Sequence, residues 1–362
     1  MFIWFGVGLA CLIAGAEALV RGASRLATII GISPLVIGLT VVAYGTSAPE
    51  AAVSVYSAFQ GQADLALGNV VGSNIFNMLF ILGLSALIVP LVVAQQLVRL
   101  DVPIMLGVSL LLFVLALDGT IGRMEGLGFV TGVLAYTGFI IHQSRRQSVE
   151  AQAVNTTEVG DGKGRWDRPV PVAIALTVAG LLLLVIGARW LVAGAVAIAT
   201  MLGVSELIIG LTIMAVATSL PEVATSVVAS LRGERDLAVG NVVGSSIFNI
   251  LLVVGLAGLV APAGIRVSPA VLRFDIPVML AVALACLPIF ATGHVIARWE
   301  GGLFFGYYVA YMCYVILDAT EHDAMPTFST IMLAFIIPLT AITLLVIVVR
   351  TMRARCRPPE AP

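Results

Sequence analysis

Long apolar stretches, separated by short polar segments, recur along almost the whole chain. A helix needs roughly 20 residues to cross about 30 Å of hydrocarbon, and eleven stretches come close to that length. They run over residues 2–20, 33–59, 65–90, 102–117, 124–142, 170–188, 204–230, 237–260, 274–292, 299–317 and 328–349. This pattern predicts an all-α polytopic membrane protein.

Composition narrows the possible functions further. Hydrophobic residues make up 60% of the 362 positions and charged residues 11%, with a mean hydropathy of +1.09, which excludes an ordinary soluble protein. The formal net charge is −1, and we expect no nucleic-acid surface. Four cysteines occur without any C-x-x-C spacing, so neither a disulfide framework nor a zinc site is expected.

The chain contains an internal repeat. Residues 31–90 align without a gap with residues 203–262, and more than half of these positions are identical. Each copy belongs to a set of five spans, and because five is odd, the second set must enter the membrane upside down. We therefore expect a first five-helix repeat (1–142), a cytoplasmic connector (143–169), an inverted second repeat (170–317), and an extra transmembrane helix with a basic cytoplasmic tail (318–362).

The basic residues predict an orientation. With the N-terminus outside, most arginines fall in cytoplasmic segments, which agrees with the positive-inside rule and leaves the C-terminus in the cytoplasm. A cleaved leader over residues 1–20 is the alternative, but that segment lacks a basic start, so we expect it to be a span.

Two acidic residues lie in the middle of predicted spans. Glu50 and Glu222 occupy equivalent repeat positions, and a carboxylate at the bilayer centre costs about 2.5 to 3.5 kcal/mol on insertion scales. Because the repeats are inverted, equivalent mid-span positions face a common centre, so we expect both acids to converge on one site. Glu17 and Arg189, also equivalent, lie near span ends, where snorkelling, pairing and lining an access route are all open to them, and we favour snorkelling.

Oxygen-bearing groups precede each acid. Thr46 and Ser47 lie four and three residues before Glu50, and Thr218 and Ser219 stand likewise to Glu222. A proline directly before each acid frees backbone carbonyls inside the span. Carboxylate, hydroxyl and carbonyl oxygens without His or Cys favour hard cations such as Ca2+ or Na+.

A second doubled motif follows each acid: GNVVGSNIFN (68–77) and GNVVGSSIFN (240–249). Its glycines allow close helix packing, and we expect four side chains to point to the same cluster: Ser73, Asn77, Ser245 and Asn249. Asn69 and Asn241 are expected to bond unwound backbone instead. Taken singly, such hydroxyls and small residues are usually structural. Their coincidence in both halves favours a functional site.

At these residues the sequence resembles the cation/Ca2+ exchanger superfamily, specifically its prokaryotic-type Na+/Ca2+ exchanger branch. GTSAPE (45–50) and ATSLPE (217–222) are similar to that family's two alpha-repeat motifs. The likeness covers residues 1 to about 317 and implies a ten-helix core of two inverted five-helix repeats, with helices two, three, seven and eight around the ions and helices one and six sliding across them.

The resemblance also implies ligands. It assigns Ca2+ to Glu50, Glu222, Thr46 and Thr218, and Na+ to two sets, Ala43, Ser47 and Ser73, and Ala215, Ser219 and Ser245, with Asn77 and Asn249 completing the central position. K+-dependent relatives carry Asp where this chain has Asn249, which weakens a K+ requirement. The cation/H+ branch is less similar, because its acid lies in a G-N-x-x-E context.

We therefore expect a secondary active antiporter that exchanges Na+ for Ca2+ by alternating access in a prokaryotic plasma membrane. Exchange of H+ for Ca2+, or of another divalent cation, is the alternative; a cation channel is a lesser one, because it predicts uncoupled conductance. An intramembrane enzyme is disfavoured, since no histidine accompanies the acids. We expect no cofactor and no protein partner beyond the ions and the lipid bilayer.

Overall fold

The computed structural model describes residues 2–155 and 170–355, and this part of the chain is almost entirely helical. Nine of its helices are long and apolar enough to cross a membrane, and up to eleven spans result if each of two bent helix pairs counts as one. The bent pairs cover Pro34–Thr46 with Ala48–Phe59 and Glu206–Ala217 with Leu220–Leu231. The expectation of an all-α polytopic membrane protein is confirmed.

The two halves follow the same order of elements, except that the first half has one additional 3-10 turn, η4. The first half comprises α1 (Phe2–Ile30), α2 (Pro34–Ile37), η1 (Gly38–Val42), α3 (Ala43–Thr46), α4 (Ala48–Phe59), α5 (Ala63–Phe76), η2 (Asn77–Ile81), α6 (Leu82–Ile88), β1 (Leu91–Val92), η3 (Leu97–Asp101), α7 (Val102–Leu115), η4 (Ala116–Asp118), β2 (Thr120–Ile121) and α8 (Arg123–Asn155). The second half comprises α9 (Val170–Met201), α10 (Glu206–Ile209), η5 (Gly210–Met214), α11 (Ala215–Ala217), α12 (Leu220–Leu231), α13 (Arg235–Phe248), η6 (Asn249–Val254), α14 (Gly255–Val260), β3 (Ile265–Arg266), η7 (Val271–Asp275), α15 (Ile276–Ala291), β4 (Val295–Ile296) and α16 (Arg298–Ala319).

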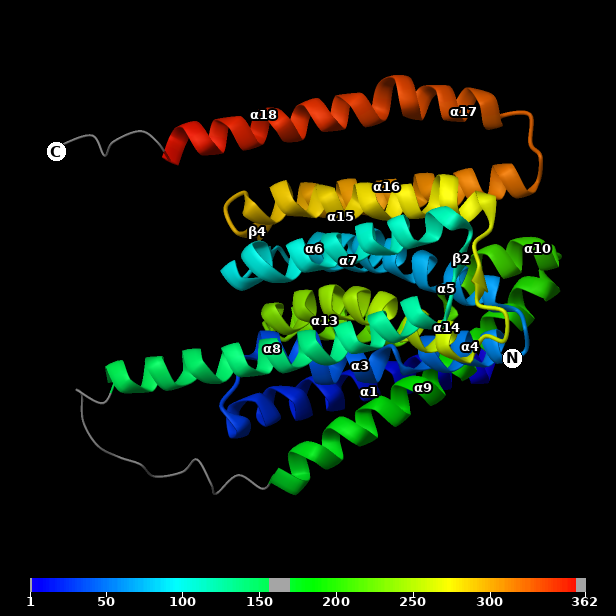
Figure 1. The fold of residues 1–362 in the computed structure, drawn as a ribbon. Coiled ribbons are helices and arrows are strands. Elements are labelled where there is room, and N and C mark those ends of the chain that lie inside the picture. The colour runs from blue at the N-terminus through cyan, green and yellow to red at the C-terminus, as the bar shows by residue number, and fades with distance from the viewer. Residues whose placement is uncertain (1, 156–169, 356–362) are drawn as a thin grey trace.

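Short strands join the two halves at the ends of the bundle. β1 pairs antiparallel with β4, and β2 pairs antiparallel with β3, so each ladder takes one strand from each half. The labels β2 and β4 lie at opposite ends of the bundle in Figure 1. This crosswise pairing is what two halves related by an inverted repeat would produce.

The centre of the bundle is formed by the spans Ala63–Ile88 and Arg235–Val260, which are the most buried of the nine. α1 and α9 pack antiparallel on each other through glycines. A Cβ added at Gly15 would lie 2.8 Å from the Leu184 nitrogen, and one at Gly187 would lie 2.7 Å from the Leu12 nitrogen. Backbones this close leave no room for a side chain, so α1 and α9 form one tightly packed unit.

The C-terminal span lies at the edge of the bundle. It consists of α17 (Met325–Ile331), η8 (Met332–Ile336) and α18 (Ile337–Arg355), and it runs along one side of the molecule in Figure 1. None of its described side chains is buried, and the Tyr307 hydroxyl donates to Thr340 Oγ1 at 2.7 Å. The segment expected to be a connector, residues 143–169, begins as helix: α8 continues to Asn155. Residues 156–169 lie outside the described part of the chain.

Candidate functional site

Two spans are broken at equivalent places near their middle. The first bends by 46° where Ser47 separates α3 from α4, and the second bends by 53° between α11 and α12, with Ser219 at the start of α12. Pro49 and Pro221 sit in the first turn after each break, where a missing N–H is tolerated. The prolines therefore start a new helix inside each span, as the sequence indicated.

The two mid-span acids come together across the break. Glu50 and Glu222 are both completely buried. Ser47 Oγ donates to Glu222 Oε1 at 2.9 Å, and Ser219 Oγ donates to Glu50 Oε1 at 2.9 Å. Each hydroxyl therefore holds the acid of the other half. The second oxygen of each carboxylate, Oε2, is buried without a hydrogen-bond partner.

The threonines and alanines differ between the two halves. Thr46 Oγ1 donates to Asn241 Oδ1 of the other half at 3.2 Å, whereas Thr218 Oγ1 is buried without a hydrogen-bond partner. The carbonyl of Ala43 accepts the Ser47 N–H at 3.0 Å, and Ala43 is fully buried, whereas Ala215 is exposed.

The second doubled motif lines the same region. Ser219 Oγ contacts Ser73 Oγ at 3.3 Å. The Ser245 hydroxyl and both polar atoms of the Asn77 side chain are buried without a partner, and so is Oδ1 of Asn249. An unsatisfied buried polar atom costs about 1 to 3 kcal/mol, so this concentration of free oxygens and amides marks a space suited to a polar or charged guest.

Two asparagines of the doubled motif make other contacts than the sequence predicts. Asn69 and Asn241 were expected to bond unwound backbone. Their amide nitrogens instead donate to Ser54 Oγ at 3.0 Å and to Ser226 Oγ at 3.1 Å. That expectation was wrong because a serine fifteen residues earlier in each copy supplies the acceptor. Asn241 also accepts from Thr46 at 3.2 Å, and so supports a site threonine from the other half.

Asn74 is a further addition to the cluster. Its Oδ1 accepts from Asn249 Nδ2 at 3.2 Å, and its own amide donates to the Ser246 carbonyl at 3.1 Å. Asn249 and Asn77 each open a π-helical turn, η6 and η2, within an otherwise α-helical span. Such turns rotate the side chains that follow and are frequent at functional sites.

The two halves of the site are not equally covered. Val42, just before α3, is 0% exposed, while its repeat equivalent Met214 is 54% exposed. Thr46 is buried and Thr218 is half-buried. Because α10 and the N-terminus lie at the same end of the bundle (Figure 1), the site is more open toward the N-terminal side.

The donor set consists of oxygens and amides. Among the described residues, no group of three or more His, Cys, Asp or Glu side chains could hold a metal by itself. Two carboxylates surrounded by hydroxyls and side-chain amides instead suit a hard cation.

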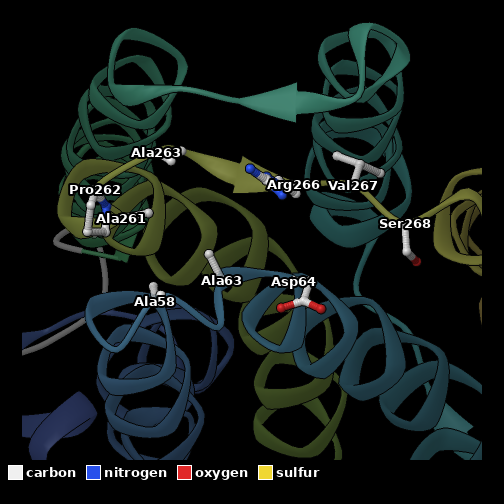
Figure 2. A pocket seen from close by; sticks show the side chains of 11 residues that line it. Ala58, Ala63, Asp64, Ala261, Pro262, Ala263, Arg266, Val267 and Ser268 are labelled. Carbon is white, nitrogen blue, oxygen red and sulfur yellow. The ribbon is translucent and has the colours of Figure 1, made fainter.

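A separate cavity of about 480 Å3 lies where α4 meets α5 (Figure 2), lined by Asp64 and Arg266 but not by the buried acids.

Comparisons with known proteins point to one family. The family described as sodium/calcium exchanger protein matches residues 1–142 and 172–317 of the chain. The putative antiporter CaxA of Alkalimonas amylolytica is 41% identical over 283 residues, which span 78% of this chain and 86% of that protein. The sodium/calcium exchanger MaX1 of Methanosarcina acetivorans is 33% identical over 341 residues, spanning 86% of this chain and 97% of its own.

A solved structure agrees with these relatives. The sodium-calcium exchanger NCX_Mj superimposes with a TM-score of 0.73 at 28% sequence identity, covering 86% of this chain and 96% of that one. The C-terminal span described above follows the last residue, 317, of the family match.

Proposed function

The chain belongs to the sodium/calcium exchanger protein family, and from that premise we propose that it exchanges Na+ for Ca2+ across the membrane by alternating access. The observation that carries this proposal is the crosswise pair of buried acids, with Ser47 on Glu222 and Ser219 on Glu50. Membership of the family already makes the chain an integral membrane transporter rather than an enzyme. The identity of the counter-ion is our proposal.

The geometry suits ions that compete for the same oxygens. One Ca2+, or Na+ ions in its place, would neutralise the two carboxylates, drawing its ligands from twelve residues: Ala43, Thr46, Ser47, Glu50, Ser73, Asn77, Ala215, Thr218, Ser219, Glu222, Ser245 and Asn249. The free Oε2 atoms and the unpartnered Asn77 side chain support such a guest.

Coupling follows from the cost of an empty site. Two buried carboxylates without a cation are uncompensated charges in a low-dielectric region, and removing one partner of a buried pair already costs about 3 to 5 kcal/mol. The empty carrier would therefore resist the change of access, whereas the Ca2+-loaded and Na+-loaded forms would cross. That difference converts a Na+ gradient into Ca2+ movement.

We also propose an orientation and a location. The positive-inside bias favours an outside N-terminus in a prokaryotic plasma membrane. The more exposed half of the site, around Met214, would then face outward.

The test is Ca2+ uptake into proteoliposomes that contain the purified protein. We expect uptake that requires an outward Na+ gradient and that neither an outward H+ gradient nor an outward K+ gradient can replace. Uptake driven by the H+ gradient alone would assign the chain to H+/Ca2+ exchange. Ca2+ flux without any counter-ion would indicate a channel and overturn the proposal.

A further inference from the structure

Five side chains connect α1 to the turn between α12 and α13, outside the site described above. Glu17 Oε1 lies 2.6 Å from a terminal guanidinium nitrogen of Arg232 and 2.5 Å from Arg21 Nε. Arg232 Nε also donates to Glu17 Oε2 at 2.9 Å. Two helical turns further along α1, Ser24 Oγ donates to Glu234 Oε1 at 2.7 Å. We call these five residues, Glu17, Arg21, Ser24, Arg232 and Glu234, the latch.

Of the roles left open for Glu17, the structure shows pairing and not the favoured snorkelling. Its side chain is 23% exposed and engages two arginines, one of which lies more than 200 residues away in the chain.

The latch joins the α1 and α9 unit to α12, and this unit packs differently against the two halves of the bundle. α1 and α9 form one packed unit, because their glycines bring the two backbones into contact. This unit packs along α12, but among the described residues α9 makes no comparable contact with α4, the repeat equivalent of α12. The unit therefore sits off-centre: it covers the half of the site that contains Val42 and leaves the half around Met214 open.

An inverted repeat implies a second arrangement, in which the α1 and α9 unit covers the half of the site around Met214 and leaves the half around Val42 open. To reach it, α1 must leave α12, and the contacts of Glu17 and Ser24 with the 232–234 turn must break. We propose that the latch holds the site closed on the side opposite the N-terminus and sets how often that side opens. This proposal rests on the proposed exchange by alternating access.

The latch has no counterpart in the other half. The repeat equivalents of Glu17, Arg232 and Glu234 are Arg189, Gln60 and Gln62, so the equivalent contact contains one charge and no opposite partner. An ion-pair network thus stabilises one closed state and not the other. A partly exposed network is worth on the order of a fivefold change in such an equilibrium, weakened by salt.

The experiment reads conformation rather than transport. Val42→Cys and Met214→Cys report on the two halves of the site, in protein whose native cysteines 11, 313 and 356 are replaced by alanine. Cys286 is kept, because it is completely buried and reports unfolding. The protein is placed in lipid nanodiscs with saturating Na+ and no Ca2+, because the loaded form is the one that changes access, and a thiol reagent then reaches both faces.

We expect Glu17→Gln to raise the labelling rate of Val42→Cys about fivefold and to leave Cys286 unlabelled. Arg232→Gln should do the same, and the double variant should do no more, because both changes remove one network. In the unchanged latch, raising choline chloride to about 1 M should act in the same direction.

The matched control is Arg25→Gln, which removes a charge from α1 that makes no ion pair within the described residues. Its labelling should equal that of the parent. The latch is refuted if Glu17→Gln leaves Val42→Cys labelling unchanged, if Arg25→Gln raises it equally, or if Cys286 labelling rises in parallel. Because transport is not measured, each of these results can occur whether or not the chain exchanges Na+ for Ca2+.

Discussion

Removing one crosswise hydroxyl should weaken Ca2+ binding while leaving the fold intact. In Ser219→Ala, Glu50 loses the donor that lies 2.9 Å from its Oε1, and Ser73 loses its neighbour at 3.3 Å. Ser47→Ala removes the equivalent 2.9 Å bond to Glu222. Since the two bonds have the same length and both partners are buried, we expect the two variants to behave alike.

The magnitude follows from the type of bond. A hydrogen bond to a charged group contributes about 1.5 to 3 kcal/mol, which corresponds to roughly a 10- to 100-fold loss of affinity when the lost hydroxyl also serves the bound ion. Alanine leaves space for a water molecule, which would bring the loss toward the lower end of that range.

The assay is the apparent KM for Ca2+ in Na+-driven uptake, together with the midpoint of thermal unfolding. Ser230→Ala is the control, because Ser230 is buried on the same helix but bonds to the Ser226 carbonyl within that helix. We expect Ser230→Ala to keep the parental KM. A parental KM in Ser219→Ala, or a large effect in one serine variant and none in the other, would refute the crosswise arrangement as the binding site.

Two further predictions concern the scaffold. Gly15→Val should lower the midpoint of thermal unfolding, because the added Cβ would lie 2.8 Å from the Leu184 nitrogen and overpacking costs about 1 to 3 kcal/mol. The control Gly6→Val, whose added Cβ would have nothing within 4 Å, should leave the midpoint unchanged. Equal shifts in the two variants would contradict the close packing of α1 on α9. Deleting residues 320–362 should leave Na+-driven Ca2+ uptake within about twofold, because no described residue of α17, η8 or α18 is buried; an uptake defect beyond about tenfold would show that this span belongs to the transport core.

Much of the architecture could be predicted because the repeat is visible in the chain. Equal spacing of Glu50 and Glu222 from the start of each copy, together with five spans per copy, is enough to bring the acids to one centre. The prolines that follow Ser47 and Ser219 predict the breaks in the two spans, and both breaks are present.

Other features depend on tertiary context. The π-helical turns that begin at Asn77 and Asn249 carry no distinctive local signal, because one inserted residue per turn is selected by packing rather than by propensity. The pairing of Glu17 with Arg232 joins positions 215 apart, and the sequence offers no rule that matches them.

The unequal exposure of the two halves was also beyond prediction. Val42 and Met214 are equivalent by repeat, yet one is buried and the other exposed. This difference arises from where the α1 and α9 unit sits, and two arrangements of an internally symmetric chain differ by only a few kcal/mol. Sequence similarity between the halves therefore predicts the shared site but not which side is open.

The central claim is that one acid from each half holds the same cation. The measurement that tests it most directly is isothermal titration of Ca2+ into the purified protein, its Glu50→Gln and Glu222→Gln variants, and Glu300→Gln as a control acid that is buried in α16 and bonds the Ala297 N–H. We predict that each of the first two variants binds Ca2+ at least about 100-fold more weakly, while Glu300→Gln binds like the parent. Parental Ca2+ affinity in either Glu50→Gln or Glu222→Gln would contradict the claim.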